Sequence, residues 1–125
     1  MESWEIVDRP KRKVQQKKFH VSLNKRGEIL MNLAAFAAIK EPANVTLLFD
    51  AKQRRIGVKF PVREDKSFFP VRRCGRGRRT RVVRALRLLR QSGFNVDETI
   101  VFKDVEIETL RGDPMLVLSL NGFVT

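Results

Sequence analysis

The chain has 125 residues, the length of one ordinary domain, and 42% of them are hydrophobic, which is enough for a buried core. Its 26 basic and 14 acidic side chains give a net charge of +12. A single cysteine, Cys74, excludes an internal disulfide, and it cannot form a metal site with the single histidine, His20. No apolar run has the length of a signal peptide or a membrane span, so we expect a cytoplasmic protein that does not enter membranes.

Residues 1–17 combine Pro10 with the Lys/Gln-rich run KRKVQQKK. This composition is typical of an extended basic arm. Such arms contact nucleic-acid backbones in some proteins and are disordered ends in others, and both interpretations stay open here.

The next segment, residues 18–62, begins with a predicted hairpin. Residues 19–23 alternate between apolar and polar side chains, as a half-buried strand does. Asn-Lys-Arg-Gly at 24–27 predicts a turn, because Gly27 can adopt positive φ, and a second strand is predicted over 29–31.

A short helix and a second hairpin are predicted to follow. Asn32 is a good N-cap, and Pro42 ends the helix because the residue before a proline is pushed out of the α region. Strands are predicted over 45–49 and 56–60. In the second of these, apolar side chains alternate with Gly57 and Lys59, which places Lys59 on the polar face.

Residues 67–122 repeat this order in outline. The run CGRGRR at 74–79 predicts a loop. An amphipathic helix is predicted across 81–90, since Val82, Ala85, Leu86 and Leu89 share one face at helical spacing. Gly93 is expected to end that helix. A strand is predicted over 99–102, with 107 as its alternative end, and another over 115–120.

These elements predict an α+β fold. Two hairpin–helix–hairpin (ββαββ) units, residues 18–62 and 67–122, would form one compact pseudo-repeat domain behind the basic arm of residues 1–17.

The positive charge is concentrated in a short stretch. Residues 71–90 contain nine arginines and no acidic side chain. The planar guanidinium suits phosphate oxygens, so this stretch favours a polyanion site over a merely solvated face. The predicted nucleic-acid-binding residues are Arg72, Arg73, Arg76, Arg78, Arg79, Arg81, Arg84 and Arg87, together with Lys25 and Arg26 in the first turn.

Phe68 and Phe69 precede the arginines. Consecutive strand residues point to opposite faces, so one of the two rings would be exposed for base stacking. The alternative is that both rings fill the core. The aromatic residues therefore do not decide between binding of duplex and of single-stranded nucleic acid.

Residues 19–60 contain Gly27 in a turn, Ile29 and Met31 after it, a short helix and a closing hairpin. In these features the segment resembles the AbrB/SpoVT family of swapped-hairpin DNA-binding domains. The resemblance implies a transcription factor with DNA contacts from Lys25 and Arg26. It also implies a homodimer, or a monomer in which two halves pair with each other.

We therefore expect a nucleic-acid-binding protein, with DNA favoured over RNA, which uses no cofactor or metal. No catalytic constellation is visible, so we do not expect an enzyme. Two alternatives remain. One is a protein-interaction module or ribonucleoprotein subunit that binds an acidic partner, and the other is an enzyme that uses the Cys74 thiol.

Overall fold

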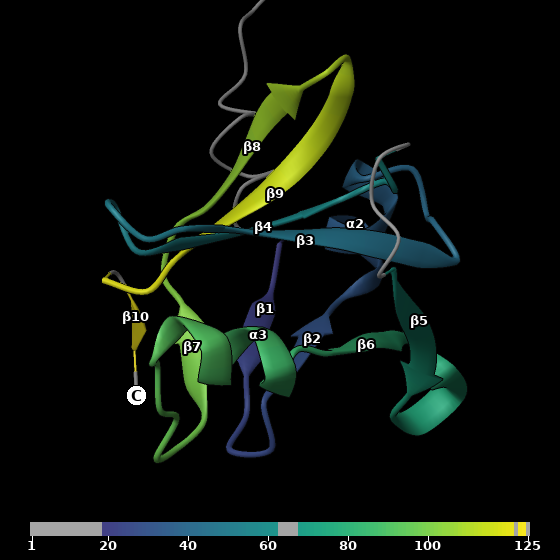
Figure 1. The fold of residues 1–125 in the computed structure, drawn as a ribbon. Helices are drawn as coiled ribbons and strands as arrows, with labels where there is room; N and C mark the ends of the chain where they lie inside the picture. The colour runs from purple at the N-terminus through teal and green to yellow at the C-terminus, as the bar shows by residue number, and fades with distance from the viewer. Residues whose placement is uncertain (1–18, 63–67, 122, 125) are drawn as a thin grey trace, which may run out of the picture.

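A computed structural model describes residues 19–62, 68–121 and 123–124, and about half of them belong to one antiparallel sheet (Figure 1). The strands are β1 (Val21–Leu23), β2 (Glu28–Met31), β3 (Asn44–Asp50), β4 (Arg55–Lys59), β5 (Phe69–Cys74), β6 (Thr80–Arg84), β7 (Ile100–Phe102), β8 (Val105–Leu110), β9 (Asp113–Ser119) and β10 (Phe123–Val124). The helices are α2 (Leu33–Ala38), α3 (Leu86–Ser92) and the single 3₁₀ turn η1 (Arg76–Arg78).

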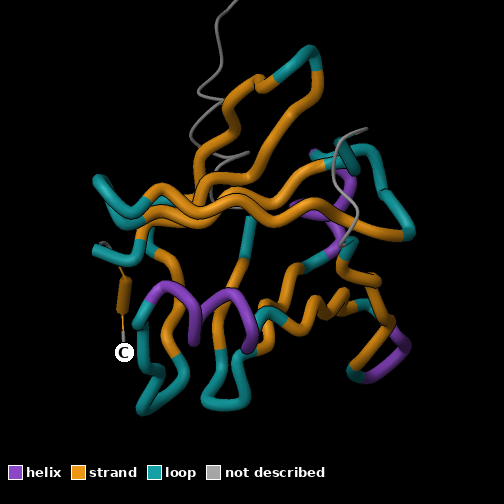
Figure 2. Tube along the Cα trace, viewed as in Figure 1, coloured by secondary structure: helices purple, strands orange, loops and turns teal. Residues whose placement is uncertain are grey.

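The ten strands follow the order β10-β7-β1-β2-β6-β5-β3-β4-β9-β8. The sheet curls into a nearly closed, barrel-like shape, with β3, β4 and β9 above β7, β1, β2 and β6 (Figures 1 and 2). Only Lys103 and Asp104 separate β7 from β8, which pair with β1 and β9 respectively. This short junction therefore draws the two ends of the strand order together.

The predicted α+β fold of two ββαββ units is wrong. The described part of the chain is 47% strand and 15% helix, with only two α-helices, and the strands of the two segments interleave. Strand β2 pairs with β6, β1 with β7, β3 with β5 and β4 with β9. A pair of hairpins with one short helix buries little apolar surface by itself, and merging both segments into one barrel buries far more.

The pairing between the segments is nearly symmetric. Five residues separate Leu23 from Ile29 in the β1–β2 hairpin, and five separate Cys74 from Thr80 in the β5–β6 hairpin. The second strands of these hairpins, β2 and β6, pair antiparallel. Consequently the two hairpin turns lie at opposite ends of this four-stranded part of the sheet.

The helix predicted across 81–90 is also wrong in its first half. Thr80–Arg84 is strand β6, held between β2 and β5, and α3 begins only at Leu86. Val82 and Val83 are both buried, a pattern that suits a strand covered on both faces better than a one-sided helix. In α3 it is Leu89 that is buried, whereas Leu86 is 38% exposed.

One core fills the barrel. Leu23, Ile29 and Val83 lie side by side on adjacent strands and are fully buried. Helix α2 contributes Phe36 and helix α3 contributes Leu89 to the same cluster. Both helices therefore cover the same core with one face and leave the other face exposed.

Two predictions about helix ends are confirmed, although the predicted topology is wrong. The side chain of Asn32 caps α2, because its Oδ1 accepts a hydrogen bond of 3.0 Å from the Ala35 amide. Gly93 ends α3 in the left-handed conformation with φ 76°. Lys59, however, is fully buried, while Phe60 is 39% exposed, so the predicted faces of 59 and 60 are wrong.

The predicted basic arm, residues 1–17, lies outside the residues that the structure describes. In the part of the chain that is described, no helix has both the length and the apolar character needed to span a membrane.

Gly27→Ala should destabilise the protein more than Gly112→Ala. Both glycines have positive φ, 76° and 84°, so each alanine costs about 1–2 kcal/mol of backbone strain. At residue 27 the new Cβ would also lie 2.8 Å from the Leu86 Cα, whereas nothing lies within 4 Å at residue 112. Urea unfolding midpoints measure the difference, and equal losses would contradict the close packing of this turn against α3.

Candidate nucleic-acid interface

The predicted binding residues fall into two groups at opposite ends of β6. The first cluster comprises Lys25, Arg26, Arg84 and Arg87, near the β1–β2 turn and the start of α3. The second cluster comprises Arg73, Arg78, Arg79 and Arg81, on the β5–β6 hairpin. The arginines of both clusters lie close together in the sequence between residues 73 and 87, apart from Arg26, and the strand register separates them.

The second cluster is organised around Arg81. Its Nη1 donates a 2.7 Å hydrogen bond to the carbonyl of Arg78, and its guanidinium lies 5.3 Å from the centre of the Phe36 ring on α2. Both contacts orient the side chain. Arg73 lies directly opposite Arg81 on β5, so the two side chains leave the sheet on the same face.

The hairpin loop of this cluster has an unusual backbone. Gly75 and Gly77 have φ values of 81° and 69°, which glycine adopts freely. Arg78 has φ 52°, a left-handed conformation that costs a residue with a Cβ about 1–2 kcal/mol. Arg78 and Arg79 are both exposed on this loop, so the strained turn presents two charges to solvent.

The second cluster has no acidic counterpart among the described residues. Its four arginines form no ion pair with any described carboxylate. Like charges directly opposite each other on a sheet are destabilising, so Arg73 and Arg81 weaken the fold that holds them. A bound polyanion would relieve this repulsion.

The first cluster is partly neutralised by Glu28. The Glu28 carboxylate lies 3.3 Å from Arg26 Nε and 3.7 Å from Arg84 Nε, so it bridges the two strands. The Ala85 amide donates a 2.8 Å hydrogen bond to the Gly27 carbonyl, which fixes the turn against the start of α3. Arg87 is exposed in the first turn of α3.

The remaining predicted residues belong to neither cluster. Arg72 is exposed on β5, but strand alternation turns it to the face opposite Arg73. The backbone of Arg76 lies in η1, and its side chain is outside the described atoms. Of the two phenylalanines, Phe68 is 45% exposed, whereas Phe69 packs against the core.

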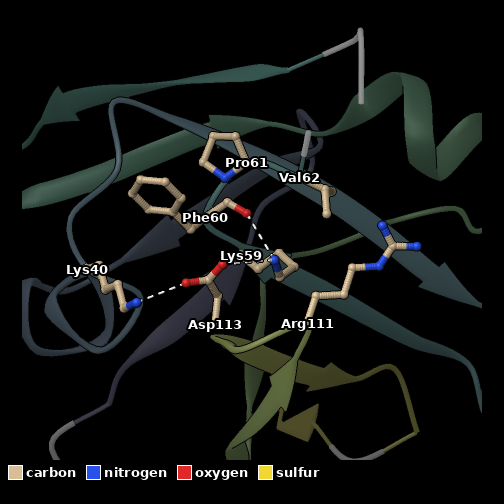
Figure 3. Close-up of a pocket in the computed structure, with 7 residues that line it drawn as sticks. All are labelled: Lys40, Lys59, Phe60, Pro61, Val62, Arg111 and Asp113. Atoms are coloured by element: carbon tan, nitrogen blue, oxygen red, sulfur yellow. Dashed lines mark hydrogen bonds and ion pairs between the residues drawn. The ribbon is translucent and has the colours of Figure 1, made fainter. Parts of the chain in front are cut away.

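A separate charged pocket, of about 410 Å³, lies where α2, β4 and β9 meet (Figure 3). The buried Lys59 ammonium donates a 3.2 Å hydrogen bond to the Phe60 carbonyl and lies 3.8 Å from Asp113 Oδ2. Lys40 Nζ donates to Asp113 Oδ1 at 2.9 Å. The Asp113 carboxylate therefore bridges two ammonium groups, an arrangement that strand periodicity does not predict for Lys59.

This setting lowers the pKa of Asp113 below its ordinary value. The hydrogen bond from Lys40 is the largest cause of this lower pKa. Burial, the second-largest effect, opposes it, and the positive charges of Lys40 and Lys59 add to the lowering.

Other chemistry is sparse in the described ranges. No group of three or more His, Cys, Asp or Glu side chains there is arranged to hold a metal ion. Cys74 is exposed at the end of β5, beside the second cluster, and His20 is exposed before β1.

Comparison of the chain with protein-family models, curated proteins and solved structures finds no match.

Asp113→Asn should reduce stability at pH 7 and have no effect in strong acid. A carboxyl whose pKa is lower in the folded than in the unfolded chain stabilises the fold while it is ionised. That stabilisation is complete well above the ordinary value of 3.8 and is lost as the pH falls through the lower folded-state value.

Urea unfolding of the parent and of Asp113→Asn from pH 7 to pH 2 measures this difference. The two curves should converge at the acid end, and Asp97→Asn, an exposed control, should follow the parent throughout. A gap between parent and Asp113→Asn that stays constant with pH would show that ionisation of Asp113 is not the cause.

Proposed function

We propose that this protein binds nucleic acid and that the second cluster contacts the phosphate backbone. The observation that supports this most is the set of four arginines on one hairpin without a described acidic partner. Arginine forks donate two parallel hydrogen bonds to phosphate oxygens, and backbone contacts of this kind provide most of the affinity for nucleic acid.

The residues of the second cluster would have different tasks. Arg73 and Arg79 are exposed and have no described hydrogen bond from their side chains, so they are available to phosphates. Arg81 is already held by the Arg78 carbonyl and the Phe36 ring, and it orients the loop that carries Arg78. The first cluster would add a second, weaker contact, because Glu28 competes with phosphate for Arg26 and Arg84.

DNA is the favoured ligand in this proposal, with regulation of transcription as its use. Both expectations rest on the resemblance of residues 19–60 to AbrB/SpoVT domains, and so does the expected homodimer.

The double variant Arg73→Gln/Arg79→Gln should bind random-sequence DNA more weakly and with a smaller salt dependence. Each lost phosphate contact reduces the slope of log K against log salt by about 0.9 for duplex DNA or about 0.7 for a single strand. Fluorescence anisotropy with labelled duplex DNA, single-stranded DNA and RNA, each at several salt concentrations, measures both quantities.

Lys52→Gln/Lys103→Gln is the matched control. It removes the same charge from two exposed lysines outside both clusters, in the β3–β4 turn and the β7–β8 junction. If both double variants lose affinity equally, binding depends on net charge and not on this hairpin. If the parent binds none of the three ligands at low salt, the proposal fails and an acidic protein becomes the partner to seek.

A further inference from the structure

A groove of about 630 Å³ lies between α3 and the strands β3 and β5. Helix α3 contacts β3, below which it lies in Figure 1, and side chains of both elements line the groove. Its size falls within the range of about 300–1,000 Å³ that is typical of small-ligand sites. The groove is distinct from the second cluster, and the charge pattern of the sequence does not reveal it.

The apolar part of the groove comes from three elements. Phe68 precedes β5 and is 45% exposed, Leu86 begins α3 and is 38% exposed, and Leu47 on β3 is half-buried. Leaving a phenyl ring and a leucine partly in water forfeits the stabilisation that burial would give them. Together they offer an apolar surface to an incoming group.

The polar part of the groove is positive. Arg84, Arg87 and Gln91 line it, and no acidic residue of the described chain does. The described ion pair of Arg84 is its long contact with Glu28 at 3.7 Å, so most of its donors remain available. The Gln91 amide both donates and accepts hydrogen bonds, as the edge of a nucleobase requires.

These features call for a ligand with a flat apolar face and a negative charge close to it. A nucleotide in a single strand has both, whereas the base faces in a duplex are stacked on one another and unavailable. We propose that the groove receives one unpaired base of a single-stranded nucleic acid. The base lies against Phe68 and Leu86, and the adjoining phosphates contact Arg84 and Arg87.

The β1–β2 turn extends this site. Gly27 packs against Leu86, and its carbonyl accepts the hydrogen bond from the Ala85 amide, so the turn borders the groove. Lys25 and Arg26 on that turn are exposed beside Arg84. A strand whose base enters the groove therefore meets further positive charge along its backbone. This inference rests on the proposed function and adds the form of nucleic acid that is preferred.

The test compares three labelled ligands by anisotropy: an oligothymidylate, a strand of the same length made of abasic sites, and a duplex. The parent should bind the oligothymidylate more tightly than the abasic strand. Phe68→Ala should weaken oligothymidylate binding by about 5- to 150-fold, the range expected for one lost stacking contact, and leave its salt slope and the abasic strand's affinity unchanged.

Two further variants separate stacking from folding. Phe68→Trp keeps an aromatic face and should retain affinity for the oligothymidylate. Phe60→Ala removes another exposed ring, 39% accessible and part of the Lys59 pocket, and should bind as the parent does. Urea unfolding of each variant shows whether the fold is retained.

The outcomes distinguish this inference from the proposed function. If the parent and Phe68→Ala bind the oligothymidylate and the abasic strand equally, the base site is refuted while backbone binding stands. If polyglutamate competes as well as the oligothymidylate at equal charge, the groove is a site for acidic peptides and the inference fails. If no nucleic acid binds, both proposals fail.

Discussion

The pairing of β2 with β6 is the contact on which the other features depend. Strand β2 pairs with β1 in one hairpin, and β6 pairs with β5 in the other. If either hairpin were absent, the edge of the remaining strand that faces it would leave backbone amides and carbonyls without partners. Ile29 opposite Val83 places the centre of this pair in the core. The same register brings Glu28 beside Arg84 and the first turn against α3.

The register also gives the two basic clusters different electrostatic characters. In the first cluster, Glu28 offers Arg26 and Arg84 an internal anion, so any ligand must compete with it. In the second, Arg73 and Arg81 face each other and the loop strains Arg78, with no described carboxylate to compensate. The described part of the chain thus has one basic surface that is partly neutralised by its own glutamate and one without a described acidic partner, which a bound polyanion would stabilise.

The sequence predicts correctly those features that depend on neighbouring residues. The Asn32 cap and the Gly93 stop depend on a few consecutive residues, and both are present. Prediction fails where partners are distant: residues 81–90 have helical periodicity, but β2 and β5 make the first part a strand. Lys59 is buried on β4 between β3 and β9, and its ion-pair partner Asp113 lies far along the chain. The arginines could be found from composition, but their division into two clusters and the Phe68 groove required the strand register.

The pairing of β1 with β7 has a consequence for how the chain is made. Ser22 lies opposite Val101, so the first strand leaves the ribosome long before its outer partner is synthesised. At about 5–20 residues per second, the intervening segment takes roughly 4–16 s to translate. During that time the growing chain carries unpaired strand edges, and contacts of such sequence separation form slowly. Closure of this barrel therefore depends on a pairing that forms late, and until it forms the nascent chain exposes strand edges that are prone to aggregation.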